Sequence, residues 1–364
     1  MTDKLKLLII TDNNGFLSGK LDYIRWFGKK RMVSGMSIDA KKIASLIRKQ
    51  GVAVSIASFC DIDFDADYSD TYVIYASSDD RGLFYKSFIE DILLFLKMSG
   101  AKLIPEFEYF RAHENKAFSE LIRKRFINDK LRVPTSRIYG SIEEMKDEKT
   151  FPVVVKMSSG SGSKGVAKAD NNSELLRISS KMNRHRYYDF AIPRDRVLYH
   201  IKNMVRRKKG IPDGGYITKM NTNKFLVQDM ILGLDCDYKV LYFFNKYYVL
   251  RRGNRENDFR ASGSHKFSFP KRIHEIRPVL DFAKEATEEI GMPMQSLDIG
   301  MNSKGDCFLI EFQCVNFGPY TLQFSDGYFY RDKGQDSWCF KHEKSDYEME
   351  YARSIAEYIL NSNS

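Results

Sequence analysis

The sequence has no hydrophobic run long enough to cross a bilayer, and it has few cysteines. A membrane-spanning helix needs about 20 mainly apolar residues, whereas the longest apolar run near the start, Leu5–Ile10, has the length of a strand. The N-terminus also lacks the small-residue cleavage pattern of a secretory signal. The five cysteines are odd in number and none has CxxC spacing, which argues against a zinc site or a disulfide framework. We therefore expect a cytoplasmic protein with reduced thiols and no transmembrane segment.

The positive charge is also distributed unevenly along the sequence. Its 58 Lys and Arg exceed its 48 Asp and Glu by ten. Residues 181–210 alone contain ten basic and two acidic residues, so the rest of the chain carries a net charge of only +2. This distribution argues against a generally basic nucleic-acid binder. The basic segment is expected either to bind an anionic substrate or an anionic surface, or to be a solvated helical insertion within 181–224.

A hydrophobic content of 43% and an aromatic content of 13% exclude disorder as the main state, and the length suggests two or three structural units. In residues 1–110, short β-branched or aromatic runs alternate with segments of helical spacing, which predicts a mostly parallel sheet covered by helices. The predicted strands are Leu5–Ile10, Val52–Ala57, Tyr72–Ala76 and Lys102–Ile104, and the predicted helices are Ile38–Gln50 and Phe84–Met98.

After residue 110, the sequence predicts helices together with strands that form antiparallel pairs. The residues around Asn245-Lys246 predict a hairpin between two of these strands. Helices are predicted at 114–129, 195–209, 275–290 and 346–361, and strands at 151–156, 165–168, 225–228, 238–244, 247–251, 296–301 and 307–312.

A Gly/Ser loop with G-x-G-x-x-G spacing follows the predicted strand that ends at Lys156. Its glycines are Gly160, Gly162 and Gly165. A dinucleotide-binding fingerprint needs a helix after the glycines, and a Walker loop needs Lys-Ser/Thr where Val166 stands. A protein kinase has its lysine after the loop rather than before it. The pattern fits a strand–loop–strand flap that closes over phosphates, with Lys156 reaching the same phosphates; an exposed hairpin turn fits it too.

Two carboxylates, Asp298 and Glu311, lie within apolar strand patterns on either side of the turn 302–305. The turn makes the two strands antiparallel neighbours, so both carboxylates can point to one place. Such hard oxygen ligands suit Mg²⁺ that bridges phosphates. Two unrelated carboxylates at strand ends would give the same pattern, but buried acidic groups cost several kcal/mol unless they are compensated.

Four arginines lie between Arg251 and Arg260, among Asn, Ser and Gly residues. Guanidinium groups bind carboxylate and phosphate oxygens in a fork-like geometry. They can therefore stabilise the charge that develops in phosphoryl or acyl transfer. A solvated basic loop is the alternative interpretation of this segment.

Taken in order, these segments resemble the ATP-grasp superfamily of carboxylate–amine or carboxylate–thiol ligases, of the ribosomal-modification and glutathione-synthase type. The resemblance runs from about Lys116 to Pro319. It rests on Asn115-Lys116 with the following helix, Val133-Pro134-Thr135, Pro152–Lys156 with its flap, the segment 227–237, the segment 258–263, and Asp298 with Glu311-Phe312-Gln313.

The resemblance implies an α/β protein in which an open parallel-sheet domain precedes an ATP-grasp fold of two α+β subdomains that clasp ATP. The implied domains are an N-terminal α/β domain at 1–110, a flap subdomain at 111–228 with the basic insertion 181–224, and a metal- and substrate-binding subdomain at 229–364.

The resemblance also implies roles for individual residues. Lys116 and Lys156 would contact the ATP phosphates, and Gly160, Gly162 and Gly165 would belong to the flap. The backbone of Gln228, Asp229, Met230 and Ile231 would read the adenine edge, Asp235 would face the ribose, and Lys239 stands where related ligases often have Arg. Arg252 and Arg260 would bind the phosphate or acyl phosphate. Asp298, Glu311 and Gln313 would hold two Mg²⁺ ions, with Mn²⁺ as an alternative; Gln313 replaces the usual Asn of this motif, and Asn316 is a nearby alternative ligand.

The implied reaction is phosphoryl transfer from ATP to a small-molecule carboxylate, followed by attack of an amine on the acyl phosphate. The substrate would be a metabolite or a precursor of a surface glycan, and a homodimer is compatible with the sequence. Two alternatives stay open. One is an ATP-grasp kinase that stops at a phosphorylated product. The other is a nucleotide-binding protein without turnover, which Gln313 favours.

Overall fold

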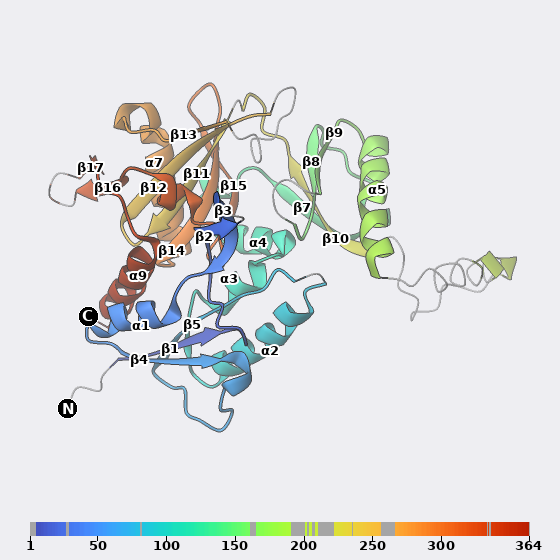
Figure 1. Cartoon of the computed structure of the whole chain (residues 1–364). Coiled ribbons are helices and arrows are strands. Elements are labelled where there is room, and N and C mark those ends of the chain that lie inside the picture. Colours follow the sequence, from blue (N-terminus) through green and yellow to red (C-terminus); the bar gives the residue numbers. More distant parts are fainter. Residues whose placement is uncertain are drawn as a thin grey trace. The chain divides into compact units, whose positions relative to one another are not determined.

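The computed structural model describes residues 5–363, except for 27–28, 81, 161–164, 191–200, 202–203, 206–207, 210–221, 235, 256–265, 333 and 335. The chain forms two compact units, which Figure 1 shows by sequence colour. Unit 1 comprises Met1–Val133 and Leu232–Ser364, and unit 2 comprises Pro134–Ile231. The domain boundaries expected near 110 and 228 stay a prediction.

Unit 1 contains a parallel sheet of four strands in the order β4-β1-β5-β6. The central strand β1 is an apolar run that is buried after its first residue, as expected for a strand covered on both faces. Helices follow β1 and β5 along the chain, so the predicted α/β arrangement is confirmed. The elements are β1 (Lys6–Thr11), α1 (Ala40–Arg48), β4 (Ala53–Ser58), β5 (Thr71–Tyr75), α2 (Phe84–Met98) and β6 (Lys102–Ile104).

A second, antiparallel sheet of unit 1 has the order β15-β14-β11-β12-β16-β17, with β13 paired to β12. Helix α7 (Ile273–Ile290) covers one face through a core that includes Val240, Leu297 and Ile299. On the other face, Leu241 and Phe243 pack in a core with residues of α1 and α9 (Tyr347–Asn361). The strands are β11 (Cys236–Phe243), β12 (Lys246–Gly253), β13 (Phe267–Ser268), β14 (Met294–Met301), β15 (Cys307–Gln313), β16 (Tyr328–Asp332) and β17 (Ser337–Lys341).

The remaining elements of unit 1 include two features that differ from the prediction. The helix expected at 114–129 ends at Arg123, where the backbone turns more tightly: Arg125 donates to the Ile122 carbonyl at 2.8 Å and Phe126 to the Arg123 carbonyl at 3.1 Å. The hairpin of β2 (Gly19–Trp26) and β3 (Lys29–Ser37) was not predicted. The other elements are α3 (Phe107–Ala112), α4 (Lys116–Arg123), α8 (Tyr320–Phe324) and the short 3-10 helices Phe59–Asp61 and Asp129–Arg132.

Unit 2 is an antiparallel sheet in the order β7-β10-β8-β9, with α5 packed against its core. The strands expected at 151–156, 165–168 and 225–228 are confirmed, whereas β7 was not predicted. Helix α5 includes the first ten residues of the basic segment 181–210, and the helix expected at 195–209 lies largely outside the described residues. The elements are β7 (Ser136–Ser141), the 3-10 helix Glu143–Met145, β8 (Val153–Met157), β9 (Val166–Ala169), α5 (Asn172–Phe190) and β10 (Thr222–Asp229).

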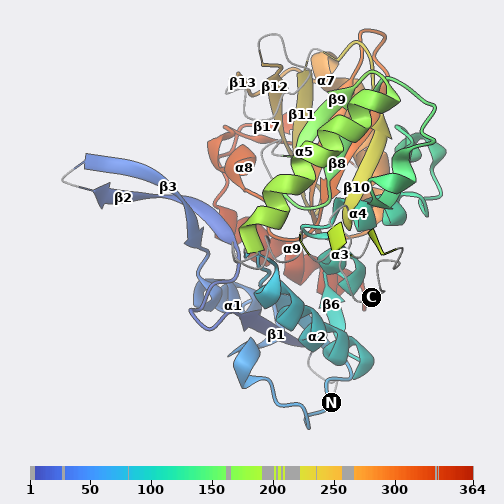
Figure 2. The same cartoon turned by 90° about the vertical axis from the view of Figure 1, so that its right-hand side faces the viewer.

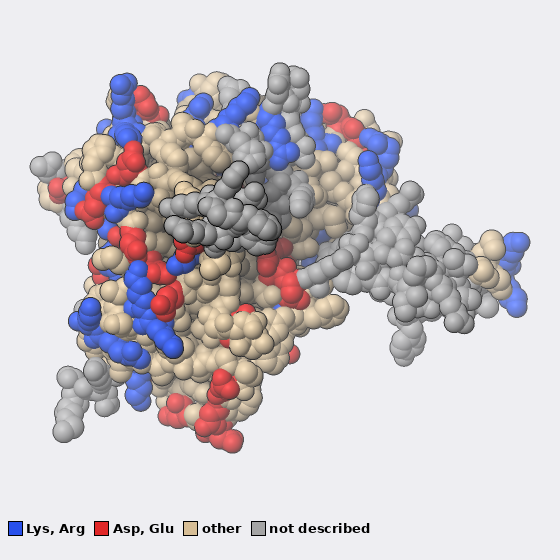
Figure 3. Space-filling view, in the orientation of Figure 1, with Lys and Arg blue, Asp and Glu red and all other residues tan. Residues whose placement is uncertain are grey.

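Charged side chains of both signs are interspersed over much of the face shown in Figure 3. Acidic side chains gather at its lower end, where the loop 61–70 of unit 1 carries five exposed aspartates. All five cysteines are free thiols. Within the parts of the chain that the structure describes, no helix combines the length and apolar character needed to span a bilayer.

Glu348, at the start of α9, joins three elements of unit 1. Its carboxylate accepts from Lys20 of β2 at 2.9 Å, from Lys42 of α1 at 2.6 Å and from the Asp39 N–H at 3.0 Å. Partial burial would raise the pKa of Glu348, but Lys42 and Lys20 outweigh it and lower the pKa to about 2. The folded state therefore binds this proton more weakly than the unfolded state does.

We expect the Glu348→Gln variant to lose about 1–2 kcal/mol of stability at neutral pH. The contribution of Glu348 is complete above the pKa of an unfolded glutamate, about 4.3. It disappears as the pH falls from there towards 2. Urea unfolding at pH 7 and at pH 3 should show a difference between variant and wild type that shrinks at the lower pH. A difference that is equal at both values would contradict this role.

Candidate active site

Asp298 of β14 and Glu311 of β15 lie directly opposite each other in the antiparallel pair. This confirms the predicted pairing of the two strands and brings the two predicted metal ligands together. Side chains at directly opposed positions on one face are close neighbours, and like charges there repel. Cations therefore have to compensate the two carboxylates.

An irregularity in the β14–β15 ladder determines where Glu311 points. Ile299 pairs with Leu309, but the neighbouring Asp298 pairs with Glu311, so Ile310 is an additional residue in β15. Leu309 faces the core beneath α7, and without the bulge Glu311, two residues further on, would face that core too. The bulge turns Glu311 to the face of Asp298, as bulges near active sites commonly do.

Arg252 of β12 connects Asp298 to a third carboxylate, Asp237 of β11. Its guanidinium donates to Asp237 at 2.5 and 2.8 Å and lies 2.8 Å from Asp298. Lys239 donates to Ser296 at 2.8 Å and to Asp298 at 3.4 Å. Arg252, Asp237 and Lys239 are buried, so the network is held away from bulk water.

The network fixes the charge of its members. Burial would raise the pKa of Asp298, but Arg252 and Lys239 outweigh it and lower the pKa to about 2. Burial raises the pKa of Asp237 to about 6 against the opposing effect of Arg252. Burial also acts to lower the pKa of Arg252, but Asp298 and Asp237 raise it above its ordinary value. Asp298 is thus an anion at neutral pH, as a metal ligand must be.

Lys116 approaches the carboxylate pair from the start of helix α4. Its ammonium lies 3.8 Å from Glu311. Asn115 caps the helix by accepting from the Phe118 N–H, which fixes where Lys116 enters it. One predicted phosphate-binding lysine and the two predicted metal ligands therefore lie together in unit 1.

In unit 2, the buried Lys156 of β8 donates to the side-chain oxygen of Gln228 of β10 at 2.8 Å. The Gln228 amide in turn donates to Ser136 of β7 at 3.1 Å. This chain of polar groups crosses three neighbouring strands. It holds the Lys156 ammonium on one face of the sheet.

The segment Gln228–Ile231 was expected to read an adenine edge through its backbone. Two of its N–H groups already have partners within unit 2, because Asp229 donates to the Thr135 carbonyl at 2.9 Å and Met230 to the Pro152 carbonyl at 3.2 Å. Recognition of adenine by this segment would therefore use its carbonyl oxygens and the Ile231 N–H. The Asp229 side chain forms an ion pair with Arg137 at 2.8 Å.

The base of the predicted flap is a closed turn of the backbone. Met157 donates to the Gly165 carbonyl at 2.9 Å, and Gly165 has φ +73. A Cβ at Gly165 would lie 3.2 Å from the Cβ of Met157, so a side chain there would be strained and crowded. Gly160 also has a positive φ. The predicted site residues Gly162, Asp235 and Arg260 lie outside the described residues.

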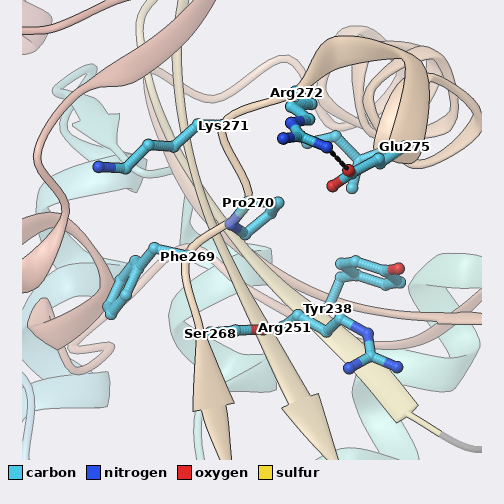
Figure 4. A pocket seen from close by; sticks show the side chains of 9 residues that line it. Tyr238, Arg251, Ser268, Phe269, Pro270, Lys271, Arg272 and Glu275 are labelled. Atoms are coloured by element: carbon cyan, nitrogen blue, oxygen red, sulfur yellow. Dashed lines mark hydrogen bonds and ion pairs between the residues drawn. The ribbon is translucent and has the colours of Figure 1, made fainter.

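Arg251 and Arg252 are neighbours in β12 and therefore point to opposite faces of the sheet. Arg251 lines a pocket of about 550 Å³ beside α7, with Tyr238, Phe269 and Lys271 among its other residues (Figure 4). Arg251 and Arg252 thus do not form one cluster, and of these two arginines Arg252 is the one that contacts the carboxylates.

The sequence predictions gave Asp237 no role. The predicted hairpin indicated that a residue of β11 would lie opposite Arg252, but its expected turn pointed to a different residue. The β11–β12 hairpin was expected to turn at Asn245-Lys246. Its turn residues are instead Phe244 and Asn245, both with positive φ. The register set by this turn pairs Asp237 with Arg252. A turn one residue later would have placed Lys239 opposite Arg252, so the exact turn decides which side chain lies beside the arginine.

The donor set of unit 1 suits a hard divalent cation. Asp298 and Glu311 supply carboxylate oxygens, and Gln313, two residues after Glu311 in β15, can supply an amide oxygen. Oxygen ligands of this kind are those that Mg²⁺ prefers. Among the residues that the structure describes, no group of three or more His, Cys, Asp or Glu forms a metal-binding cluster. The amide of Gln313 would therefore complete the protein ligands.

Solved structures of similar fold were found for the chain. It is similar to the D-cycloserine synthetase DcsG, with 12% identity, 97% of this chain and 99% of that chain covered, and a TM-score of 0.50. It is also similar to the RimK domain protein ATP-grasp from Sphaerobacter thermophilus DSM 20745, with 11% identity, 98% and 99% coverage, and a TM-score of 0.47. No protein-family model and no curated protein matches the chain. The chain has the ATP-grasp fold, and the resemblance seen in the sequence is confirmed at this level.

Proposed function

We propose that the chain is an ATP- and Mg²⁺-dependent ligase that activates a carboxylate as an acyl phosphate and joins it to an amine. The observation that carries this proposal is the opposed pair Asp298 and Glu311, which the bulge at Ile310 turns to one face beside Arg252 and Lys239. Both carboxylates are partly buried, and holding two like charges directly opposite each other is unfavourable unless cations compensate them. The ATP-grasp fold of the chain agrees with this chemistry.

The proposed reaction has two steps. A carboxylate oxygen of the substrate attacks the γ-phosphorus of ATP, the bond to the bridging oxygen breaks, and ADP leaves. The amine then attacks the carbonyl carbon of the acyl phosphate, loses a proton, and expels inorganic phosphate as the amide bond forms. Asp298, Glu311 and Gln313 would hold Mg²⁺, which neutralises phosphate charge when it is bound.

The basic residues of unit 1 would stabilise the charge of both steps. Arg252 is locked by Asp237, so its guanidinium is oriented in advance, and oriented donors are worth more in a site that excludes water. Lys116 and Lys239 add two ammonium groups next to the carboxylates. In unit 2, Lys156 and the segment Gln228–Ile231 would bind the nucleotide.

Replacing Lys156 with alanine is expected to abolish turnover without unfolding the chain. The variant loses the ammonium that would bind phosphate oxygens, and it leaves the buried Gln228 oxygen without this donor, which costs about 1–3 kcal/mol. Lys168→Ala is a matched control in the neighbouring strand β9, because the Lys168 side chain is 39% exposed and pairs with the exposed Asp170. ADP release and circular dichroism of both variants test this role; a normal rate for Lys156→Ala would refute it.

A screen of acid–amine pairs for ADP release, with mass spectrometry of the products, tests the proposed function. The ligase account expects ADP release that depends on both an acid and an amine, and a product of amide mass. ADP release with a phosphorylated product and no dependence on amine would instead identify a kinase.

One observation favours a nucleotide-binding protein without turnover as a second candidate. Asp298, a proposed metal ligand, is already paired with Arg252 and Lys239, and Gln313 replaces the usual Asn. Under this account, isothermal titration would detect ATP binding that needs no Mg²⁺, and no acid–amine pair would release ADP.

A further inference from the structure

Three polar residues of α4 lie on one side of that helix. Lys116, Glu120 and Arg123 are spaced at i, i+4 and i+7, so they follow one another along a single helix face. Lys116 lies 3.8 Å from Glu311, and Arg123 donates to the Leu309 carbonyl at 3.0 Å. In both Figure 1 and Figure 2, α3 and α4 lie between the parallel and the antiparallel sheet of unit 1. This side of α4 therefore contacts strand β15 at two of its residues.

The guanidinium of Arg123 is held in place by Glu120. Its Nε donates to a carboxylate oxygen of Glu120 at 3.0 Å, its Nη2 donates to the same oxygen, and its Nη1 donates to the Leu309 carbonyl. Both residues are buried, since Arg123 is 2% and Glu120 is 5% exposed. Hydrogen-bonded polar groups that are buried in this way rigidify their surroundings. Arg123 is therefore a rigid donor for the backbone of β15.

The carbonyl that Arg123 binds belongs to the peptide group that enters the bulge. Leu309 is the last residue before the additional residue Ile310, so its C=O and the Ile310 N–H share one planar peptide group. β15 is the last strand at one end of its sheet, and among the described strands it pairs with β14. The bond from Arg123 fixes the orientation of this peptide group at the point where the β14–β15 ladder is irregular.

The residue after Glu311 is anchored as well. Phe312 is buried, and its ring centroid lies 5.5 Å from that of Phe126, which follows α4, and 6.4 Å from that of Tyr109 in α3. Neighbouring residues of a strand point to opposite faces, so a fixed Phe312 directs Glu311 away from this core. The bulge is thus held at both ends, by a hydrogen bond at Leu309 and by packing at Phe312.

We propose that Arg123 is a positioning residue for the metal site. Held by Glu120, it fixes the bulge at Ile310 and so keeps Glu311 on the face of Asp298, where the metal would bind. Because Arg123 is buried and bonds to the backbone of β15, it acts through Glu311 rather than on the substrates. The role in metal binding rests on the proposed function, whereas the hold on the bulge does not depend on it.

The test variant replaces both members of the buried pair, Glu120→Met and Arg123→Met. Removing Arg123 alone would leave an uncompensated buried charge and risk unfolding, whereas apolar replacement of a whole buried pair is often neutral. The matched control is Asp129→Met with Arg132→Met. Arg132 likewise pairs with a carboxylate three residues before it, at 2.9 Å, and donates to a backbone carbonyl, that of Phe126 at 2.6 Å. This carbonyl lies outside β15.

Titration with Mn²⁺ in the presence of ADP, followed by electron paramagnetic resonance, measures the metal site without turnover. We expect the pair variant to bind Mn²⁺ at least about tenfold more weakly than the wild type, and the control to bind it like the wild type. The affinity for ADP without metal should be the same in all three, whereas a general loss of structure would lower both affinities. Equal Mn²⁺ affinity of the pair variant and the wild type would overturn the proposal.

Hydrogen exchange of the segment 307–313 tests the hold on the bulge directly. Exchange should be faster in the pair variant than in the wild type, because the peptide group before Ile310 has lost its donor from α4. The control should exchange this segment at the rate of the wild type. Equal exchange in the pair variant and the wild type would show that Arg123 does not fix the bulge.

Deletion of Ile310 tests whether Arg123 acts through the bulge. Without the additional residue, Glu311 would directly follow Leu309 and lie opposite Asp298 in a regular ladder, which places it on the same face. Adding the pair variant to this deletion should therefore leave Mn²⁺ affinity unchanged relative to the deletion alone. A tenfold loss that persists in the deletion background would overturn the proposed mechanism.

The variant Glu311→Ala separates this inference from the proposed function. If Glu311→Ala weakens Mn²⁺ binding but the pair variant does not, the inference fails alone. If Glu311→Ala binds Mn²⁺ like the wild type, the metal site of the proposed function fails, and hydrogen exchange still decides whether Arg123 holds the bulge. If Mn²⁺ binding depends on both Glu311 and the pair but no acid–amine pair releases ADP, the ligase function fails, whereas the positioning role stands.

Discussion

Replacing Glu311 with alanine is expected to lower amine-dependent ADP release by at least about 10²–10³-fold while the chain stays folded. The variant removes one of two opposed carboxylates that would hold Mg²⁺. Stability should change by less than about 0.5 kcal/mol, because removing one like charge beside Asp298 compensates for the loss of the 3.8 Å pair with Lys116. Steady-state kinetics and urea unfolding measure the two effects.

Glu288→Ala is the matched control, because Glu288 is an exposed carboxylate of the same unit that pairs only with Lys284 on one helix face. Its activity should equal that of the wild type. Glu311→Ala should also weaken the effect of Mg²⁺ on the melting temperature in the presence of ADP. If Glu311→Ala and Glu288→Ala behave alike in both assays, the carboxylate pair is not the metal site.

Replacing Arg252 with methionine is expected to cost about 3–5 kcal/mol of stability and to abolish turnover. Arg252 is buried, and its loss leaves Asp237 and Asp298 without their shared partner. Removing one member of a buried ion pair is costly, because the remaining charge has no compensation. Urea unfolding and ADP release measure both losses.

Arg251→Met is a control on the neighbouring residue, since Arg251 is exposed and faces the other side of the sheet. Its stability should change by less than about 0.5 kcal/mol. Adding Asp237→Asn to Arg252→Met should recover part of the stability but no activity. Equal stability of Arg251→Met and Arg252→Met would show that the Arg252 network does not stabilise the fold.

Much of the fold could be predicted from the sequence where local patterns agree with tertiary packing. The strands β1, β5 and β6 are short apolar runs, and α2 has helical spacing that ends at Ser99-Gly100. The β2–β3 hairpin could not be predicted, because basic residues interrupt its hydrophobic alternation and its base is held by distant residues such as Gln323 and Glu348.

The candidate site was only partly predictable for a related reason. The apolar strand patterns and the turn at 302–305 placed Asp298 and Glu311 on neighbouring strands. No local pattern shows that Ile310 is an additional residue, although this bulge decides which face Glu311 takes. The pairing of Asp237 with Arg252 likewise depends on the register of the β11–β12 hairpin. A turn displaced by one residue changes that register.

The most direct test of the proposed ligase follows the oxygen atoms of the acid. The active acid from the ADP-release screen is labelled with ¹⁸O in both carboxylate oxygens and incubated with ATP, Mg²⁺ and the amine. If the carboxylate attacks ATP, the released phosphate carries one ¹⁸O atom and the amide product retains the other. Phosphate without ¹⁸O, formed at the same rate as ADP, would contradict activation of the carboxylate as an acyl phosphate.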